Sequence, residues 1–138
     1  MMRISVVIPT FNRSRLLRRT VPALLSQKTE QWFSYEVLFV SNGSTDESGD
    51  ILSAAQKENP NLRYFRIDPT GGPSAPRNHG IRQATGEVII LIDDDVLPEP
   101  DLVLEHARFH REFQDLHHAG LGEVYIPPDL QSDPMALF

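Results

Sequence analysis

The sequence contains no cysteine. It therefore has no disulfide framework, no thiolate zinc site and no cysteine nucleophile, which agrees with a reducing compartment. No apolar run approaches the ~20 residues that a membrane span requires, and the apolar run after Arg3 is too short for the core of a signal peptide. We expect a cytoplasmic chain without a transmembrane segment. Attachment to the cytoplasmic face of a membrane would require parts that this chain does not contain.

Basic side chains are outnumbered, with 13 Lys and Arg against 19 Asp and Glu and a net charge of -6. No dense cluster of Lys and Arg occurs, which argues against a nucleic-acid-binding surface. The 138 residues, 40% of them hydrophobic, suffice for one domain with its own core. We therefore predict that residues 1–138 form a single globular domain.

An apolar run followed by three acids stands out from the rest of the sequence. The run Val88–Ile92 is rich in β-branched residues and is typical of a strand buried on both faces of a parallel sheet. Asp93, Asp94 and Asp95 follow it directly. Ligands of open α/β sheets bind at the carboxyl ends of the strands, and adjacent carboxylates suit Mg²⁺ or Mn²⁺. The alternative is a solvated turn that starts a helix, because Asp is common there too.

Further β-rich runs alternate with helical patterns along the chain. Strands are expected at Ile4–Ile8, which Pro9 would end, and at Tyr35–Val40, Leu62–Ile67 and Gly122–Ile126. Helices are expected from Ser14 to about Gln27, and after a capping box formed by Ser44 and Glu47. A short helix with Arg77 near its start is expected next, and then a helix from Asp101 with a buried stripe of Leu102, His106, Phe109 and Phe113. This order predicts an α/β fold with a mainly parallel, doubly wound sheet and helices on both faces.

Two loops have the composition of ligand-binding segments. Asn42-Gly43 is a common turn sequence. Taken alone, this loop agrees equally well with a simple turn and with a ligand contact. The Gly- and Pro-rich segment Asp68–Gly80 would let backbone approach a ligand closely, and Arg77 in it could reach a phosphate or carboxylate. His106 and His110 are four residues apart, but no Glu lies between them as in zinc proteases, so we assign them no metal role.

Four motifs in order resemble glycosyltransferase family 2, whose members are inverting enzymes with the Rossmann-like GT-A fold. They are Val6 to Arg13, Val40 to Asp46, Pro76 to Ile81 and Leu91 to Asp95. Each lies at the expected carboxyl end of a strand or in the loop beyond it, and the resemblance covers nearly all of residues 4–101. It implies that a nucleotide-diphosphate sugar lies across the sheet edge and that its sugar passes to an acceptor hydroxyl.

The resemblance also implies roles for individual residues. The aspartates match the family's DxD motif, which implies Asp95 and Asp93 as ligands of Mn²⁺ or Mg²⁺ and Asp93 and Asp94 as donor contacts. The other donor-binding residues that it implies are Pro9, Thr10, Asn12, Asn42, Asp46 and Arg77. Relatives often carry an aspartate in place of Asn42, where it recognises the base. Asn42 can still donate and accept hydrogen bonds, so base recognition is compatible with it, and which base it selects, uracil included, stays open.

The chain is short for this family, whose acceptor-binding part and general base lie well beyond the DxD motif. Glu123 and Asp129 come too early to be nominated as the base, so we expect a truncated, donor-binding half. The acceptor class, whether saccharide, lipid or protein, stays open. The alternative is a non-catalytic nucleotide-sugar-binding or interaction module that lacks the base. Apolar residues at Met135 to Phe138 suggest a homodimer.

Overall fold

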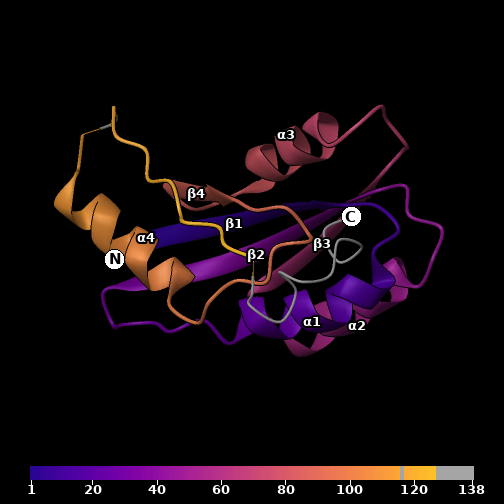
Figure 1. Cartoon of the computed structure of the whole chain (residues 1–138), viewed down its shortest axis with the longest axis horizontal. Coiled ribbons are helices and arrows are strands. Elements are labelled where there is room, and N and C mark those ends of the chain that lie inside the picture. Colours follow the sequence, from indigo (N-terminus) through magenta and orange to yellow (C-terminus); the bar gives the residue numbers. More distant parts are fainter. Residues whose placement is uncertain (116, 127–138) are drawn as a thin grey trace.

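The computed structural model describes residues 1–115 and 117–126, which form a four-stranded, fully parallel sheet in the order β3-β2-β1-β4. The strands are β1 (Met2–Thr10), β2 (Phe33–Asn42), β3 (Leu62–Ile67) and β4 (Val88–Leu91). The helices are α1 (Ser14–Leu25), α2 (Ser48–Glu58), α3 (Ser74–Gln83) and α4 (Leu102–Glu112). Figure 1 shows α3 on one side of the sheet and α1 and α2 on the other. The predicted α/β sheet with helices on both faces is confirmed.

One face of the sheet carries the main hydrophobic core. Side chains alternate between the faces of a strand, so Ile4, Val6 and Ile8 of β1 point the same way and are fully buried. Helices α1, α2 and α4 cover this face with a continuous cluster of apolar side chains, which includes Leu17, Leu24, Leu52, Val103 and Ala107. The alternation of strands and amphipathic helices thus brings the helices onto the sheet as the pattern predicts.

The opposite face is covered by α3, which approaches the sheet closely at Gly80. A Cβ atom placed on Gly80 would lie 2.4 Å from Cγ1 of Val7 and 3.3 Å from Cγ2 of Val40. Because α3 follows the Gly- and Pro-rich segment, this contact fixes where that segment leaves the sheet. Packing at Gly80 therefore helps to position the loop at the carboxyl edge.

Strand β1 continues through Pro9 to Thr10, so the prediction that Pro9 ends the strand is wrong. The Val7 carbonyl accepts a hydrogen bond from Ile92 on the β4 side, and Pro9, two residues on, faces the same side. The β1–β4 pairing ends at Leu91, so the ladder needs no N–H from Pro9 there.

Strand β4 is an edge strand, and the prediction that it is buried on both faces is wrong. Ile90 is 6% exposed and packs in the core, whereas Ile89 and Leu91 are 38% and 52% exposed on the other face. Helix α3 packs on β1 and β2, so its coverage of that face stops short of β4. An apolar run alone does not distinguish a central strand from such an edge.

Three smaller predictions are also corrected. Residues 122–126 form no strand. Helix α2 begins at Ser48 without a Ser44–Glu47 capping box, because the Ser44 hydroxyl accepts a hydrogen bond from the Asn12 amide instead. The buried face of α4 consists of Val103, Leu104 and Ala107 rather than the predicted stripe. Phe109 and Phe113 of that stripe stack on each other, outside the core.

Among the described residues, no helix is long and apolar enough to cross a membrane. Asp129 and the apolar segment 135–138, on which the dimer prediction rests, lie outside the described residues.

A buried carboxylate ties β2 to the turn before β4. Glu36 accepts hydrogen bonds from the Ser5 hydroxyl at 2.7 Å, from the Thr85 amide and hydroxyl at 2.8 and 2.7 Å, and from Arg63 at 3.2 Å. Burial alone would raise the pKa of Glu36, but these donors outweigh it and lower the pKa from 4.5 to about 2. The ionised form is thus stabilised in the folded chain.

Replacing Gly80 with Ala should lower the free energy of unfolding by about 1–3 kcal/mol, because the added methyl group overlaps Val7. The overlap should exceed the helix-propensity gain of roughly 1 kcal/mol. Urea denaturation measures the difference. Gly49→Ala in α2 is the matched control, since the nearest atom there is the Tyr64 hydroxyl at 3.3 Å. Equal stability of the two variants would contradict this packing.

The carboxylate of Glu36 should make stability depend on acid. Its folded pKa lies below 4.5, so its contribution is complete above about pH 4.5 and is lost as the pH falls towards 2. We expect the contribution to reach about 3 kcal/mol. Glu36→Gln should be less stable at neutral pH and lose less stability on acidification. Urea midpoints between pH 7 and 2.5 test this, with Glu58→Gln at the exposed end of α2 as the control.

Candidate active site at the carboxyl edge of the sheet

A pocket of about 480 Å³ opens at the carboxyl ends of the strands. The ends of β1 and β2 and the segment after β4 contribute to it, together with the start of α3 and the loop before that helix. Seven residues predicted from the sequence line this pocket: Pro9, Thr10, Asn42, Arg77, Asp93, Asp94 and Asp95. Parallel strands end at one edge, so motifs far apart in the chain meet there.

The middle aspartate of the triplet faces inwards. Asp94 is 9% exposed, and its Oδ2 accepts a hydrogen bond from the Thr10 hydroxyl at 2.8 Å. Its Oδ1 lies 3.7 Å from Nε of Arg13, and its carbonyl accepts from the Thr20 hydroxyl of α1 at 3.3 Å. Burial raises the pKa of Asp94, and the Thr10 hydrogen bond opposes this only in part. Asp94 therefore joins the acidic segment to β1 and α1.

The two outer aspartates are exposed. Asp93 forms a salt bridge with the guanidinium group of Arg77 in α3. The carboxylate of Asp95 makes no hydrogen bond or ion pair with the described part of the chain. Within residues 1–115 and 117–126, no three His, Asp or Glu side chains form a ready metal cluster. Within the described part of the chain, the outer aspartates thus comprise one carboxylate without a polar partner and one paired with a cation.

The remaining predicted residues, Asn12 and Asp46, do not line the pocket but join the loops beside it. Asn12 has a φ of 51°, and its Oδ1 accepts hydrogen bonds from the amides of Thr45 and Asp46 at 2.8 and 3.3 Å. The Asp46 carboxylate accepts from the amides of Ser14 and Ser48, both at 3.0 Å. Desolvation would raise the pKa of Asp46, but these hydrogen bonds lower it to about 2. Both residues hold the starts of α1 and α2.

Seven lining residues were not nominated from the sequence: Phe11, Arg13, Pro69, Thr70, Gly72, Pro73 and Pro76. Most lie in segments already predicted to be ligand-binding loops, so the position of each loop was foreseeable but its lining side chains were not. Phe11 carried one signal, since it is a large aromatic residue placed at a strand's carboxyl end. It is 52% exposed, which leaves its ring open to the pocket.

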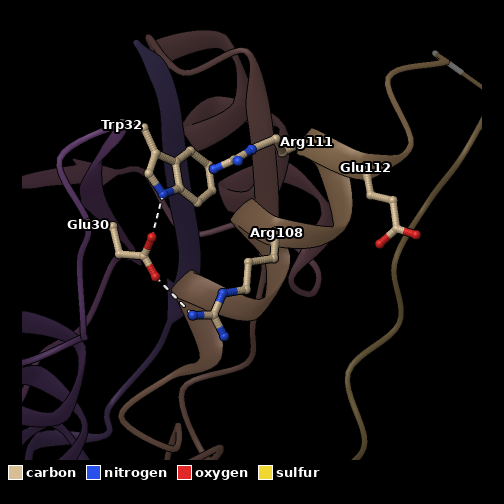
Figure 2. Close-up of a pocket in the computed structure, with 5 residues that line it drawn as sticks. All are labelled: Glu30, Trp32, Arg108, Arg111 and Glu112. Atoms are coloured by element: carbon tan, nitrogen blue, oxygen red, sulfur yellow. Dashed lines mark hydrogen bonds and ion pairs between the residues drawn. The ribbon is translucent and has the colours of Figure 1, made fainter.

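A second hollow, of about 320 Å³, lies at the amino ends of the strands between α4 and the segment before β2. Figure 2 shows Arg111 lying against the Trp32 ring, with its guanidinium carbon 4.7 Å from the ring centroid. Glu30 accepts hydrogen bonds from the Trp32 indole at 2.6 Å and from Arg108 at 2.9 Å. Because these side chains already form hydrogen bonds and ring contacts with one another, we interpret this cluster as a structural contact that holds α4 against the segment before β2.

A parallel α/β sheet with acidic and basic groups at its carboxyl edge belongs to the class of open α/β domains, in which ligands bind at the strand ends. Residues 5–118 match the family model described as Glycosyl transferase family 2. The sequence is 37% identical over 114 residues to a poly(ribitol-phosphate) beta-glucosyltransferase of Bacillus spizizenii. The match covers 82% of this chain and 18% of that protein. The chain therefore belongs to glycosyl transferase family 2, as its motifs predicted.

Solved structures agree with this assignment. S. aureus TarS 1-349 in complex with UDP-GlcNAc superposes with a TM-score of 0.74 and 25% identity, over 88% of this chain and 37% of the solved TarS chain. A mannosyltransferase from Pyrobaculum calidifontis, solved with GDP-Man and Mn²⁺, shares the fold with a TM-score of 0.71 and 24% identity, over 79% of this chain and 32% of its own. The chain spans between 18% and 37% of the length of these relatives.

The link between Thr10 and Asp94 should contribute measurably to stability. Thr10→Val keeps the shape of the side chain but leaves the buried Asp94 carboxylate without its donor, which should cost about 1–3 kcal/mol. Thr10→Ser keeps the hydroxyl and is the matched control. Thermal and urea unfolding of the three proteins measure the difference. If the Val and Ser variants were equally stable, Thr10 would not hold Asp94 in place.

Proposed function

We propose that this chain is the donor-binding domain of a glycosyltransferase that binds a nucleoside-diphosphate sugar in the carboxyl-edge pocket. The observation that carries the proposal is that strand ends and the start of α3, distant in sequence, bring Thr10, Asn42, Arg77 and the three aspartates to one pocket. TarS, a relative that shares the fold, is solved with UDP-GlcNAc. A uridine-diphosphate sugar is therefore the first donor to test.

The charges of the pocket suit a diphosphate that is held by both a cation and a metal. Arg77 places its guanidinium group at the first turn of α3, where the backbone amides and the helix dipole also favour an anion. Asp95 and Asp93 would hold Mn²⁺ or Mg²⁺, because such ions bind through one or two carboxylates together with substrate phosphates and water. The exposed carboxylate of Asp95, which has no hydrogen-bond or ion-pair partner within residues 1–115 and 117–126, fits this role. Asp93 would bind the ion while its carboxylate also pairs with Arg77.

The reaction that we propose is an inverting displacement. The acceptor is a hydroxyl group of a saccharide, lipid or protein, and its oxygen attacks the anomeric carbon from the face opposite the diphosphate. The bond between that carbon and the diphosphate oxygen breaks, and the acceptor proton passes to a base. A bound divalent ion would supply charge stabilisation for the departing diphosphate. The chain's part is to orient the donor and to place Arg77 beside the growing negative charge.

Calorimetric titration with UDP, GDP and dTDP, each with and without Mn²⁺, tests the donor site. We expect binding that depends on the metal, and we expect Asp95→Ala to weaken it by at least about tenfold, or ~1.4 kcal/mol. The reason is that the variant removes a proposed carboxylate ligand without removing a hydrogen bond of the described residues. Asp50→Ala, an exposed acid of α2 outside the pocket, is the matched control and should bind like the unmodified chain.

Two results would count against the proposal. Equal affinity of the Asp95 and Asp50 variants would remove Asp95 from the metal site. A folded chain that binds none of these nucleotides would favour the interaction-module alternative over a donor-binding domain.

A further inference from the structure

The side chain of Asn42 uses all of its hydrogen-bonding capacity inside the protein. Its Oδ1 accepts from the Thr70 amide and the Thr70 hydroxyl, both at 2.9 Å. Its Nδ2 donates to the carbonyls of Thr70 at 3.0 Å and Gly72 at 3.3 Å. A primary amide offers two acceptor positions and two donor hydrogens, so none is left for a ligand. Asn42 is also only 8% exposed.

These partners determine which end of the amide faces which group. A backbone N–H can only donate, so the atom near the Thr70 amide must be the oxygen of Asn42. Carbonyl oxygens can only accept, so the atom near Thr70 O and Gly72 O must be the nitrogen. An aspartate at position 42 could accept from Thr70 but would face two carbonyl oxygens without a hydrogen to share. The loop in this conformation therefore requires an amide at position 42.

The segment that Asn42 holds forms one wall of the pocket. Pro69, Thr70, Gly72 and Pro73 all line it. The next residue, Gly43, supports the same contact, because it has a φ of 74° and a Cβ there would lie 2.4 Å from Cγ of Pro69. Two adjacent residues at the end of β2 thus fasten a loop that lies outside any helix or strand.

We propose that Asn42 is a positioning residue that fastens the 69–73 loop as a preformed wall of the pocket, and that its side chain does not read the nucleobase. This inference rests on the proposed function, and it differs from the base-recognition role that the family resemblance implies for this position. Truncating Asn42 should therefore weaken the binding of every nucleotide by a similar factor, because the substitution loosens the pocket wall that all of them contact. If Asn42 instead made contacts to the base, its substitution would weaken the binding of nucleotides with one base only.

The first test needs no nucleotide. Hydrogen exchange, followed residue by residue by NMR, should show the Thr70 amide exchanging at least about tenfold faster in Asn42→Ala than in the unmodified chain, because its acceptor is gone. Asn59→Ala is the matched control, since the Asn59 amide bonds to the end of α2 instead. An unchanged exchange rate at Thr70 in Asn42→Ala would overturn the fastening role.

The second test compares UDP, CDP, GDP and dTDP by calorimetry in the presence of Mn²⁺. Asn42→Ala and Asn42→Asp should each weaken all four nucleotides by about tenfold or more, with the ratios among the four unchanged within about threefold. Asn59→Ala should leave all four affinities unchanged. A loss confined to one base, or no loss at all, would overturn the proposal. If the unmodified chain bound no nucleotide, the proposed function and the pocket-wall role would both fail, while the exchange rates would still decide whether Asn42 fastens the loop.

Discussion

The hydrogen bond from Thr10 to Asp94 joins the end of β1 to the acidic segment after β4, and the arrangement of the pocket depends on it. Strand β1 lies between β2 and β4, so its end is the point where the other strand ends meet. Because Asp94 is drawn inwards by Thr10 and Arg13, the triplet is divided into one buried acid and two exposed acids. A motif that reads as three equivalent carboxylates therefore has one buried member, which joins strands, and two exposed members at the pocket.

Much of the fold was predictable from periodicity and composition. Runs of β-branched, aromatic and other apolar residues identified each of the four strands to within two residues, because such side chains fit a buried, pleated surface, although the same reasoning also predicted a strand at 122–126 that does not form. The carboxyl-edge rule then placed the aspartates, Arg77 and Asn42 at one edge, since it follows from parallel pairing alone. Sequence order and topology together were enough to locate the pocket.

The remaining features depend on contacts that no local pattern encodes. The exposure of Ile89 and Leu91 follows from where α3 stops on the sheet, which is a matter of packing. The role of Asn42 is set by Thr70, which is 28 residues away and meets it only after two strands pair. The mistaken capping box has the same cause, because Ser44 bonds to Asn12 of another loop. Side chains that join two loops are the part of a site that sequence reasoning misses.

The central claim is that the carboxyl-edge pocket is the nucleotide-binding surface of this chain. Backbone ¹H–¹⁵N NMR spectra recorded during titration with UDP and Mg²⁺ test it most directly, because every described amide reports at once. The largest shifts should fall on Thr10, Gly43, Thr70 and the three aspartates. Shifts gathered instead around Trp32 and Arg111, at the opposite end of the sheet, would contradict it.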